Sequence, residues 1–76
     1  MKTGEEKLKE VKEILHYWGE DDTQTLESII IKPDGKIMID SVSFGGCFIA
    51  DLVKYGYRCE LYGSLTRGGG VSLWID

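Results

Sequence analysis

Cys47 is the residue whose surroundings best suit covalent chemistry. It follows Gly45-Gly46 and precedes an apolar stretch predicted to be helical. The exposed amides in the first turn of a helix favour a thiolate. A nucleophilic enzyme would also need a base, for which His16 is the one histidine, with Asp40 or Asp51 to orient it. Cysteine is also among the most commonly buried residue types, so a packing role is favoured. A cysteine-dependent enzyme stays an alternative, and no catalytic residue is assigned.

The acidic run Glu20-Asp21-Asp22 supplies the oxygen ligands that hard cations prefer. Its spacing differs from that of an EF-hand loop, whose ligands alternate. Short charged runs usually face solvent, so residues 20–24 are predicted to form a polar loop. We therefore predict no metal site here. Asp21 and Asp22 are instead expected to contact a basic partner.

The glycine-rich stretch Gly63–Gly70 contains Thr66-Arg67-Gly68-Gly69-Gly70. Backbone amides of such turns can bind anions, and Arg67 could add a bidentate contact. The stretch matches neither a P-loop nor the dinucleotide-binding glycine pattern, and no helix is predicted after it. We expect a loop between two strands in which Arg67 contacts a protein partner. A dimer that binds a small ligand or nucleotide through this loop is the alternative, and no cofactor is predicted.

Tyr62, Trp74 and Met38 are predicted to project from the outward face of a sheet. Aromatic side chains beside an arginine such as Arg58 are typical of protein-binding hot spots. Stacking on nucleobases would need surrounding positive charge, which neighbouring carboxylates offset here. Arg58, Tyr62 and Trp74 are therefore predicted to bind a protein. Either the helix at residues 4–18 or a second copy of the chain is expected to cover this face.

The elements that must position these residues are readable from their spacing. Thr3 and Glu6 form a capping-box pattern at the start of a helix over residues 4–18. Three isoleucines predict a strand over 26–32, and Pro33-Asp34-Gly35 predicts the turn into a second strand, 36–40. A second helix is expected from about Gly46 to the glycine at 56, followed by strands at 57–62 and 71–76. The expected fold is α+β: one domain over residues 1–76, with two helices on a four-stranded, largely antiparallel sheet in α-β-β-α-β-β order.

Alternation along these strands predicts the core. The residues expected to face the helices are Ile37, Ile39, Tyr57, Cys59, Leu61, Val71, Leu73 and Ile75. The consecutive isoleucines of the first strand would place apolar side chains on both of its faces. Which face of this strand points to the core therefore stays open. The predicted core is small, as it must be in a chain of 76 residues.

Charge and composition argue against binding to nucleic acid, insertion into a membrane and secretion. The net charge of −4 disfavours direct binding to nucleic acid or to an anionic membrane. No apolar run approaches the roughly 20 residues that span a bilayer, and the first residues do not resemble a secretory signal. Two cysteines without a Cys-x-x-Cys pair indicate a reduced, cytoplasmic protein.

The function predicted from these features is that of a small, acidic, non-enzymatic binding domain. We expect it to inhibit or regulate a larger basic protein, one that could itself handle nucleic acid. Small acidic inhibitors that mobile genetic elements direct against host defences offer an analogy in size and charge alone. Self-association into a homodimer is a further expectation, because a core this small rarely supplies more than about 3–5 kcal/mol.

Overall fold

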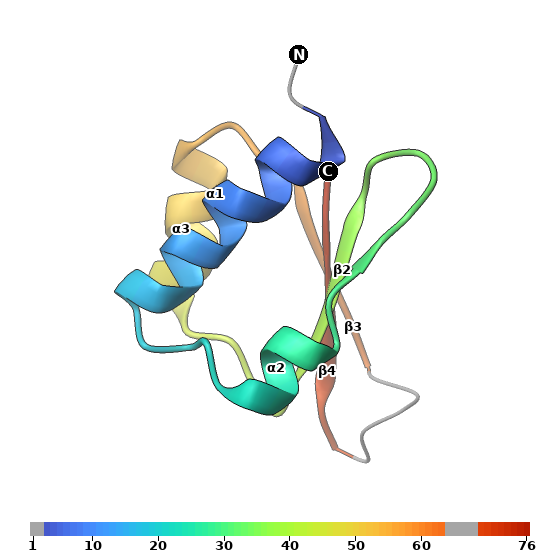
Figure 1. Ribbon diagram of the computed structural model, residues 1–76. Coiled ribbons are helices and arrows are strands. Elements are labelled where there is room, and N and C mark those ends of the chain that lie inside the picture. Colours follow the sequence, from blue (N-terminus) through green and yellow to red (C-terminus); the bar gives the residue numbers. More distant parts are fainter. Residues whose placement is uncertain (1–2, 64–68) are drawn as a thin grey trace.

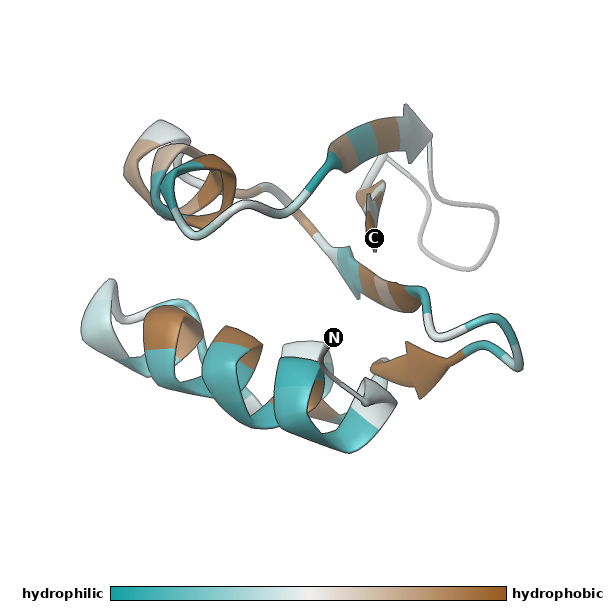
Figure 2. Cartoon of the chain, turned by 90° about the horizontal axis from the view of Figure 1, so that it is seen from above, coloured by the Kyte–Doolittle hydropathy of each residue, from teal (hydrophilic) through white to brown (hydrophobic). Residues whose placement is uncertain are grey.

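The computed structural model describes residues 3–63 and 69–76 and places helices on one side of an antiparallel sheet (Figures 1 and 2). The fold is therefore α+β, as the sequence predicted. In chain order the elements are α1 (Gly4–Tyr17), α2 (Thr23–Glu27), β1 (Ile30–Ile31), β2 (Ile37–Ser41), α3 (Gly46–Lys54), β3 (Cys59–Gly63) and β4 (Val71–Ile75).

Helix α1 begins and ends where its sequence signals predict. The Thr3 side chain accepts a hydrogen bond from the Glu6 amide, and the Glu6 carboxylate accepts one from the Thr3 amide, both at 3.2 Å. This pairing satisfies two amides that have no partner within the helix. Gly19 follows the helix with a φ of 69°, a conformation that glycine adopts readily.

Helix α2 was not predicted, and the expectations of a polar loop over 20–24 and a strand from Leu26 were wrong. Asp22 caps this helix, since its carboxylate accepts hydrogen bonds from the Thr25 amide at 3.2 Å and the Thr25 hydroxyl at 2.5 Å. The threonine side chain is fully buried, which fixes the short helix against the rest of the domain. The isoleucine run therefore contributes only two residues, Ile30–Ile31, to the sheet.

The strands are arranged in the order β1-β2-β4-β3, and all neighbours are antiparallel. The predicted turn joins β1 to β2, with Gly35 at a φ of 89°. Strands β2 and β3 run in the same direction with β4 between them, so α3 forms the crossover connection that joins them. Seen from above, α1 and α3 lie along one side of the strands (Figure 2).

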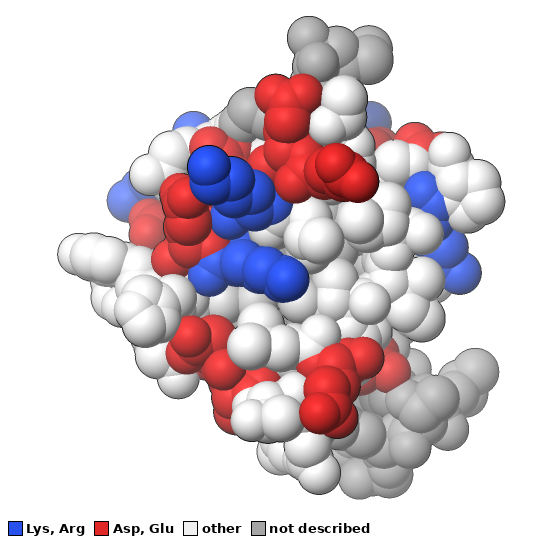
Figure 3. All heavy atoms as spheres, viewed as in Figure 1, with Lys and Arg blue, Asp and Glu red and all other residues white. Residues whose placement is uncertain are grey.

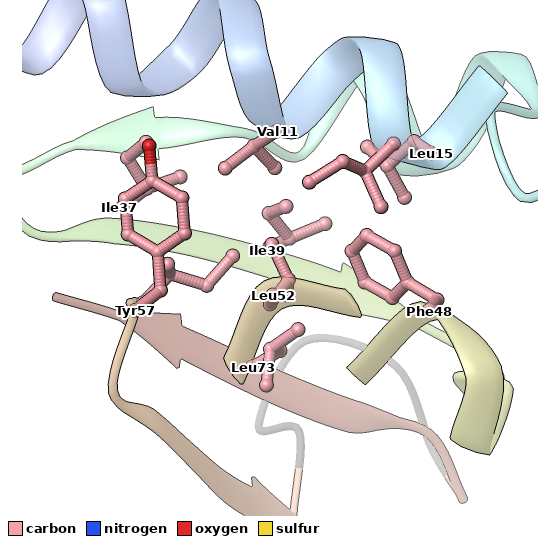
Figure 4. Close-up of a cluster of buried hydrophobic side chains, with 10 residues drawn as sticks. Val11, Leu15, Ile37, Ile39, Phe48, Leu52, Tyr57 and Leu73 are labelled. Atoms are coloured by element: carbon pink, nitrogen blue, oxygen red, sulfur yellow. The ribbon is translucent and has the colours of Figure 1, made fainter. Parts of the chain in front are cut away.

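The core lies between the helices and the sheet (Figure 4). Its buried members are Val11, Ile14, Leu15, Ile37, Ile39, Phe48, Leu52, Tyr57, Leu73 and Ile75. The predicted core was wrong at Leu61. This residue shares the helix side of the sheet with Leu73, but 52% of it is exposed because β3 is an edge strand. Asp40 and Ser72 are paired across β2 and β4 and alternate with the core residues, yet both are buried, and the serine hydroxyl donates a hydrogen bond to the carboxylate.

Candidate functional site

A groove of about 470 Å³ runs between α1 and α3. It combines carboxylates with aromatic rings, and its lining residues are Glu10, Glu13, Ile14, Tyr17, Trp18, Asp51 and Tyr55. This volume falls within the roughly 300–1,000 Å³ typical of sites that hold a small molecule. The groove was not predicted from the sequence.

Helical spacing brings these residues together. Glu10, Glu13 and Tyr17 recur at three and four residues along α1. Asp51 lies in α3, and Tyr55, four residues later, is the C-cap of that helix. Residues three and four apart share one face of a helix. Each helix therefore presents an acidic and aromatic stripe next to its buried face, and packing of the helices places the two stripes opposite each other.

Hydrogen bonds fix two of the carboxylates in position. The Trp18 indole Nε1 donates to Asp51 Oδ2 at 2.7 Å and so links the end of α1 to α3. At the other end of the groove, the Tyr57 hydroxyl donates to Glu10 Oε1 at 2.5 Å. Lys54 Nζ lies 3.9 Å from the other Asp51 oxygen, an exposed pairing of the kind that contributes little to stability.

The aromatic rings of the groove face solvent. Tyr17 is 76% exposed and Tyr55 58% exposed, although both are large apolar side chains. Tyr17 and Trp18 pack edge to face with ring centroids 5.0 Å apart. Carboxylates beside exposed aromatic faces are the features that bind an organic cation, through ion pairing and cation–π attraction together.

Three of the predicted contact residues gather at a different place. Arg58, Tyr62 and Trp74 line a pocket of about 200 Å³ on the sheet face away from the helices, together with Lys36, Glu60 and Asp76. The rings of Tyr62 and Trp74 pack edge to face at 6.2 Å, and Lys32 Nζ lies 5.1 Å from the Trp74 ring centroid. Helix α1 covers the other face of the sheet, so the first of the two alternatives, that this helix covers the aromatic residues, was wrong.

The charges around this second pocket balance one another. Tyr62 donates its hydroxyl hydrogen bond to Glu60, and this bond raises the pKa of the tyrosine. Arginine and lysine are offset by glutamate and aspartate in the lining. With a volume below the usual range for ligand sites, this pocket is a weaker candidate than the groove.

The predicted acidic contacts take part in local structure. Asp21 Oδ2 lies 2.8 Å from His16 Nδ1, and this hydrogen bond lowers the pKa of the aspartate. Asp22 caps α2, as described above. Arg67 lies outside the described residues, as does most of the glycine-rich stretch, so the prediction of an anion or partner contact there stays a prediction.

Cys47 is exposed in the first turn of α3. The same helix end already has an anion, because Glu20 Oε1 accepts a hydrogen bond from the Gly45 amide at 2.7 Å. An anion of the chain itself therefore occupies the start of α3, where negative charge is favoured. Cys59 is half-buried, and burial raises the pKa of its thiol.

The described residues contain neither a candidate metal site nor a helix that could span a membrane. No group of three or more His, Cys, Asp or Glu side chains in residues 3–63 and 69–76 could hold a metal ion. Over the same residues, no helix has both the length and the apolar character needed to cross a bilayer.

No family model, curated protein or solved structure matches this chain. The groove and the surface around it are therefore the features that can indicate a function.

Proposed function

We propose that this domain binds a basic protein and acts as its inhibitor or regulator, without catalysing a reaction. The observation that carries the proposal is the groove between α1 and α3, where the carboxylates of Glu10, Glu13 and Asp51 meet three exposed aromatic rings. A cationic side chain of the partner would occupy it. Of the two common cations, arginine suits the groove better, because its flat guanidinium can stack on a ring while it pairs with a carboxylate.

The charge of the whole chain also favours a basic partner. The net charge is −4, and in the view of Figure 3 carboxylates gather over α2 and the turn before it. Asp21 and Asp22 belong to this acidic region, which lies just beyond Trp18 in the chain. Such a field accelerates association with a basic surface, and salt weakens it over a Debye length of about 8–10 Å.

Two parts of the surface would affect the two rate constants of binding separately. The acidic region around α2 would raise the association rate, since its charges act at a distance. The groove would set the dissociation rate, since a desolvated side chain held by aromatic rings must leave it before the complex separates. The two contributions can be separated by measuring the two rates.

The first test uses a defined probe, a synthetic peptide of alternating arginine and glycine. Its binding is followed by Trp18 fluorescence in a Trp74→Phe background, which removes the other tryptophan. We expect saturable binding that weakens with salt and is stronger than for a lysine–glycine peptide of the same length. A glutamate–glycine peptide should not bind.

The second test compares an exposed aromatic residue in the groove with one on the open face of the sheet. Tyr17→Ala should weaken binding by about tenfold or more, as expected for a loss of roughly 1.4 kcal/mol or more at an aromatic contact. Tyr62→Ala removes a similar ring from the opposite face and should leave binding unchanged. If Tyr62→Ala weakens binding and Tyr17→Ala does not, the pocket on the open face is the binding site and the groove is not.

A further inference from the structure

Strand β3 ends the sheet with an edge that no other described strand pairs with. Arg58 and Asp76 exchange two backbone hydrogen bonds, of 3.1 and 2.9 Å, so they are a hydrogen-bonded pair. Antiparallel strands alternate such pairs with pairs whose backbone groups point the other way. Glu60 and Tyr62 therefore bond to β4, whereas Cys59, Leu61 and Gly63 direct their N–H and C=O groups to the free edge.

This edge has little of the protection that proteins usually give to edge strands. Lysine, proline and bulges are the common devices that prevent an edge from pairing. The sequence of β3, Cys-Glu-Leu-Tyr-Gly, has neither lysine nor proline, and its register with β4 is continuous. Its one charged residue, Glu60, lies on the sheet face away from the helices.

Exposed apolar side chains lie beside the same edge. Leu61 is 52% exposed on the helix side of β3, and Val53 of α3 is 57% exposed. On the helical wheel of α3, Asp51 lies toward α1, so Val53 and Ile49 lie on the side away from α1. An added strand would extend both the sheet and the helix layer over these residues.

We propose that this edge binds β3 of a second copy of the chain, antiparallel, with Leu61 opposite Leu61 at the two-fold axis. This register places Cys59 opposite Gly63 of the second copy. Every outward N–H and C=O of the three residues then has a partner. A shift by two residues would leave some of these groups without one.

The side chains of β3 are complementary to themselves in this register. Glu60 lies opposite Tyr62 of the second copy, so a carboxylate meets a phenol hydroxyl and not another carboxylate. The Tyr62 hydroxyl donates its one hydrogen to Glu60 of its own chain, so what this register gains is that no carboxylate lies opposite another. Like charges directly opposite each other would oppose pairing, and this register avoids them within β3. An isologous contact of this kind closes as a dimer and does not continue into a fibre.

The pairing would place the helices of both copies on one side of an eight-stranded sheet, since opposite residues point to the same face. Two copies of the groove would then face the same direction. This consequence for partner binding rests on the proposed function, whereas the dimer itself does not.

Sedimentation equilibrium over a concentration series tests the proposal. We expect the parent chain to approach twice its mass of 8.5 kDa. Leu61→Lys places two like charges opposite each other at the axis and should weaken the dimer by at least about tenfold. Ile30→Lys is the matched control, since Ile30 is 48% exposed on the other edge strand, and it should leave the dimer intact. A parent chain that stays monomeric at millimolar concentration overturns the proposal.

Cross-linking distinguishes a lost interface from a lost fold. In a Cys47→Ser background, Leu61→Cys should form a disulfide to itself, since hydrogen-bonded antiparallel pairs lie about 5.5 Å apart, within disulfide range. Ile30→Cys in the same background is the control and should form little. Peptide mapping identifies the linked residues. If the two variants cross-link equally, or if Leu61→Lys stays folded and dimeric, β3 is not the interface.

Discussion

The two edge strands of the sheet differ in length and in composition. Strand β1 has two residues and is followed directly by Lys32 and Pro33, whereas β3 has five residues and contains neither lysine nor proline. The difference continues into the next strand. Beyond β1, the Ser28 hydroxyl accepts a hydrogen bond from the Asp40 amide at 2.9 Å. Its one hydrogen is shared between the carbonyl oxygens of Thr25 at 2.7 Å and Asp40 at 3.0 Å. One serine side chain thus takes the place of a strand partner, and the β1 edge is closed.

This contrast shows that edges can be closed by different means in one small sheet. The β1 edge is closed within the chain, by a short strand, a proline and the serine that follows α2. The β3 edge has no equivalent among the described residues, and for that reason we propose that a second copy completes it. The contrast can be tested by damaging the core that supports both edges, then the closed edge, then the turn that leads to it.

The largest effect is expected from the core that both edges share. Leu52 is fully buried in α3, the crossover between β2 and β3. Leu52→Ala should lower the free energy of unfolding by about 2–5 kcal/mol, because it leaves a cavity. Urea denaturation monitored by circular dichroism measures the loss. The exposed neighbour Val53→Ala is the control and should cost far less in the monomer, and an unchanged midpoint for Leu52→Ala would contradict this account of the core.

A smaller effect is expected at the closed edge. Ser28→Ala removes the hydroxyl that accepts from the Asp40 amide and shares its hydrogen between the carbonyl oxygens of Asp40 and Thr25, so it leaves partly buried polar groups without that partner. We expect a loss of about 1–3 kcal/mol and faster hydrogen exchange of the Asp40 amide. Ser43→Ala, at an exposed serine, is the control. Unchanged exchange at Asp40 would show that the serine does not close this edge.

The smallest effect concerns the turn before α2. The hydrogen bond from His16 lowers the pKa of Asp21 below its ordinary value of 3.8, because it favours the charged carboxylate in the folded state. A lowered pKa adds stability above pH 3.8, and this contribution is lost as the pH falls below that value. The melting temperature of the parent should exceed that of Asp21→Asn at pH 6, and the gap should close toward pH 2.5. A gap that stays constant over this range would contradict the prediction.

Local signals in the sequence determined much of the fold. The Thr3–Glu6 capping box and Gly19 delimit α1, because cap residues satisfy backbone groups within a few positions of themselves. The turn before Lys36 and the alternation of β2 and β4 are equally local, so they were predicted with little error. Helix α2 was missed although Asp22 and Thr25 carry a capping signal, because the isoleucines that follow favoured a strand.

The tertiary structure alone decided the strand order and the groove. The place of β4 between β2 and β3 depends on how α3 packs across the sheet, which no short stretch of sequence encodes. Trp18 and Asp51 are 33 positions apart, and only packing of α1 on α3 brings the indole to the carboxylate. The acidic stripe of each helix can be read from its spacing, but the groove exists only where the two stripes meet. The exposure of Leu61 has the same origin, since alternation gives a residue its face of the sheet and only the strand order makes β3 an edge.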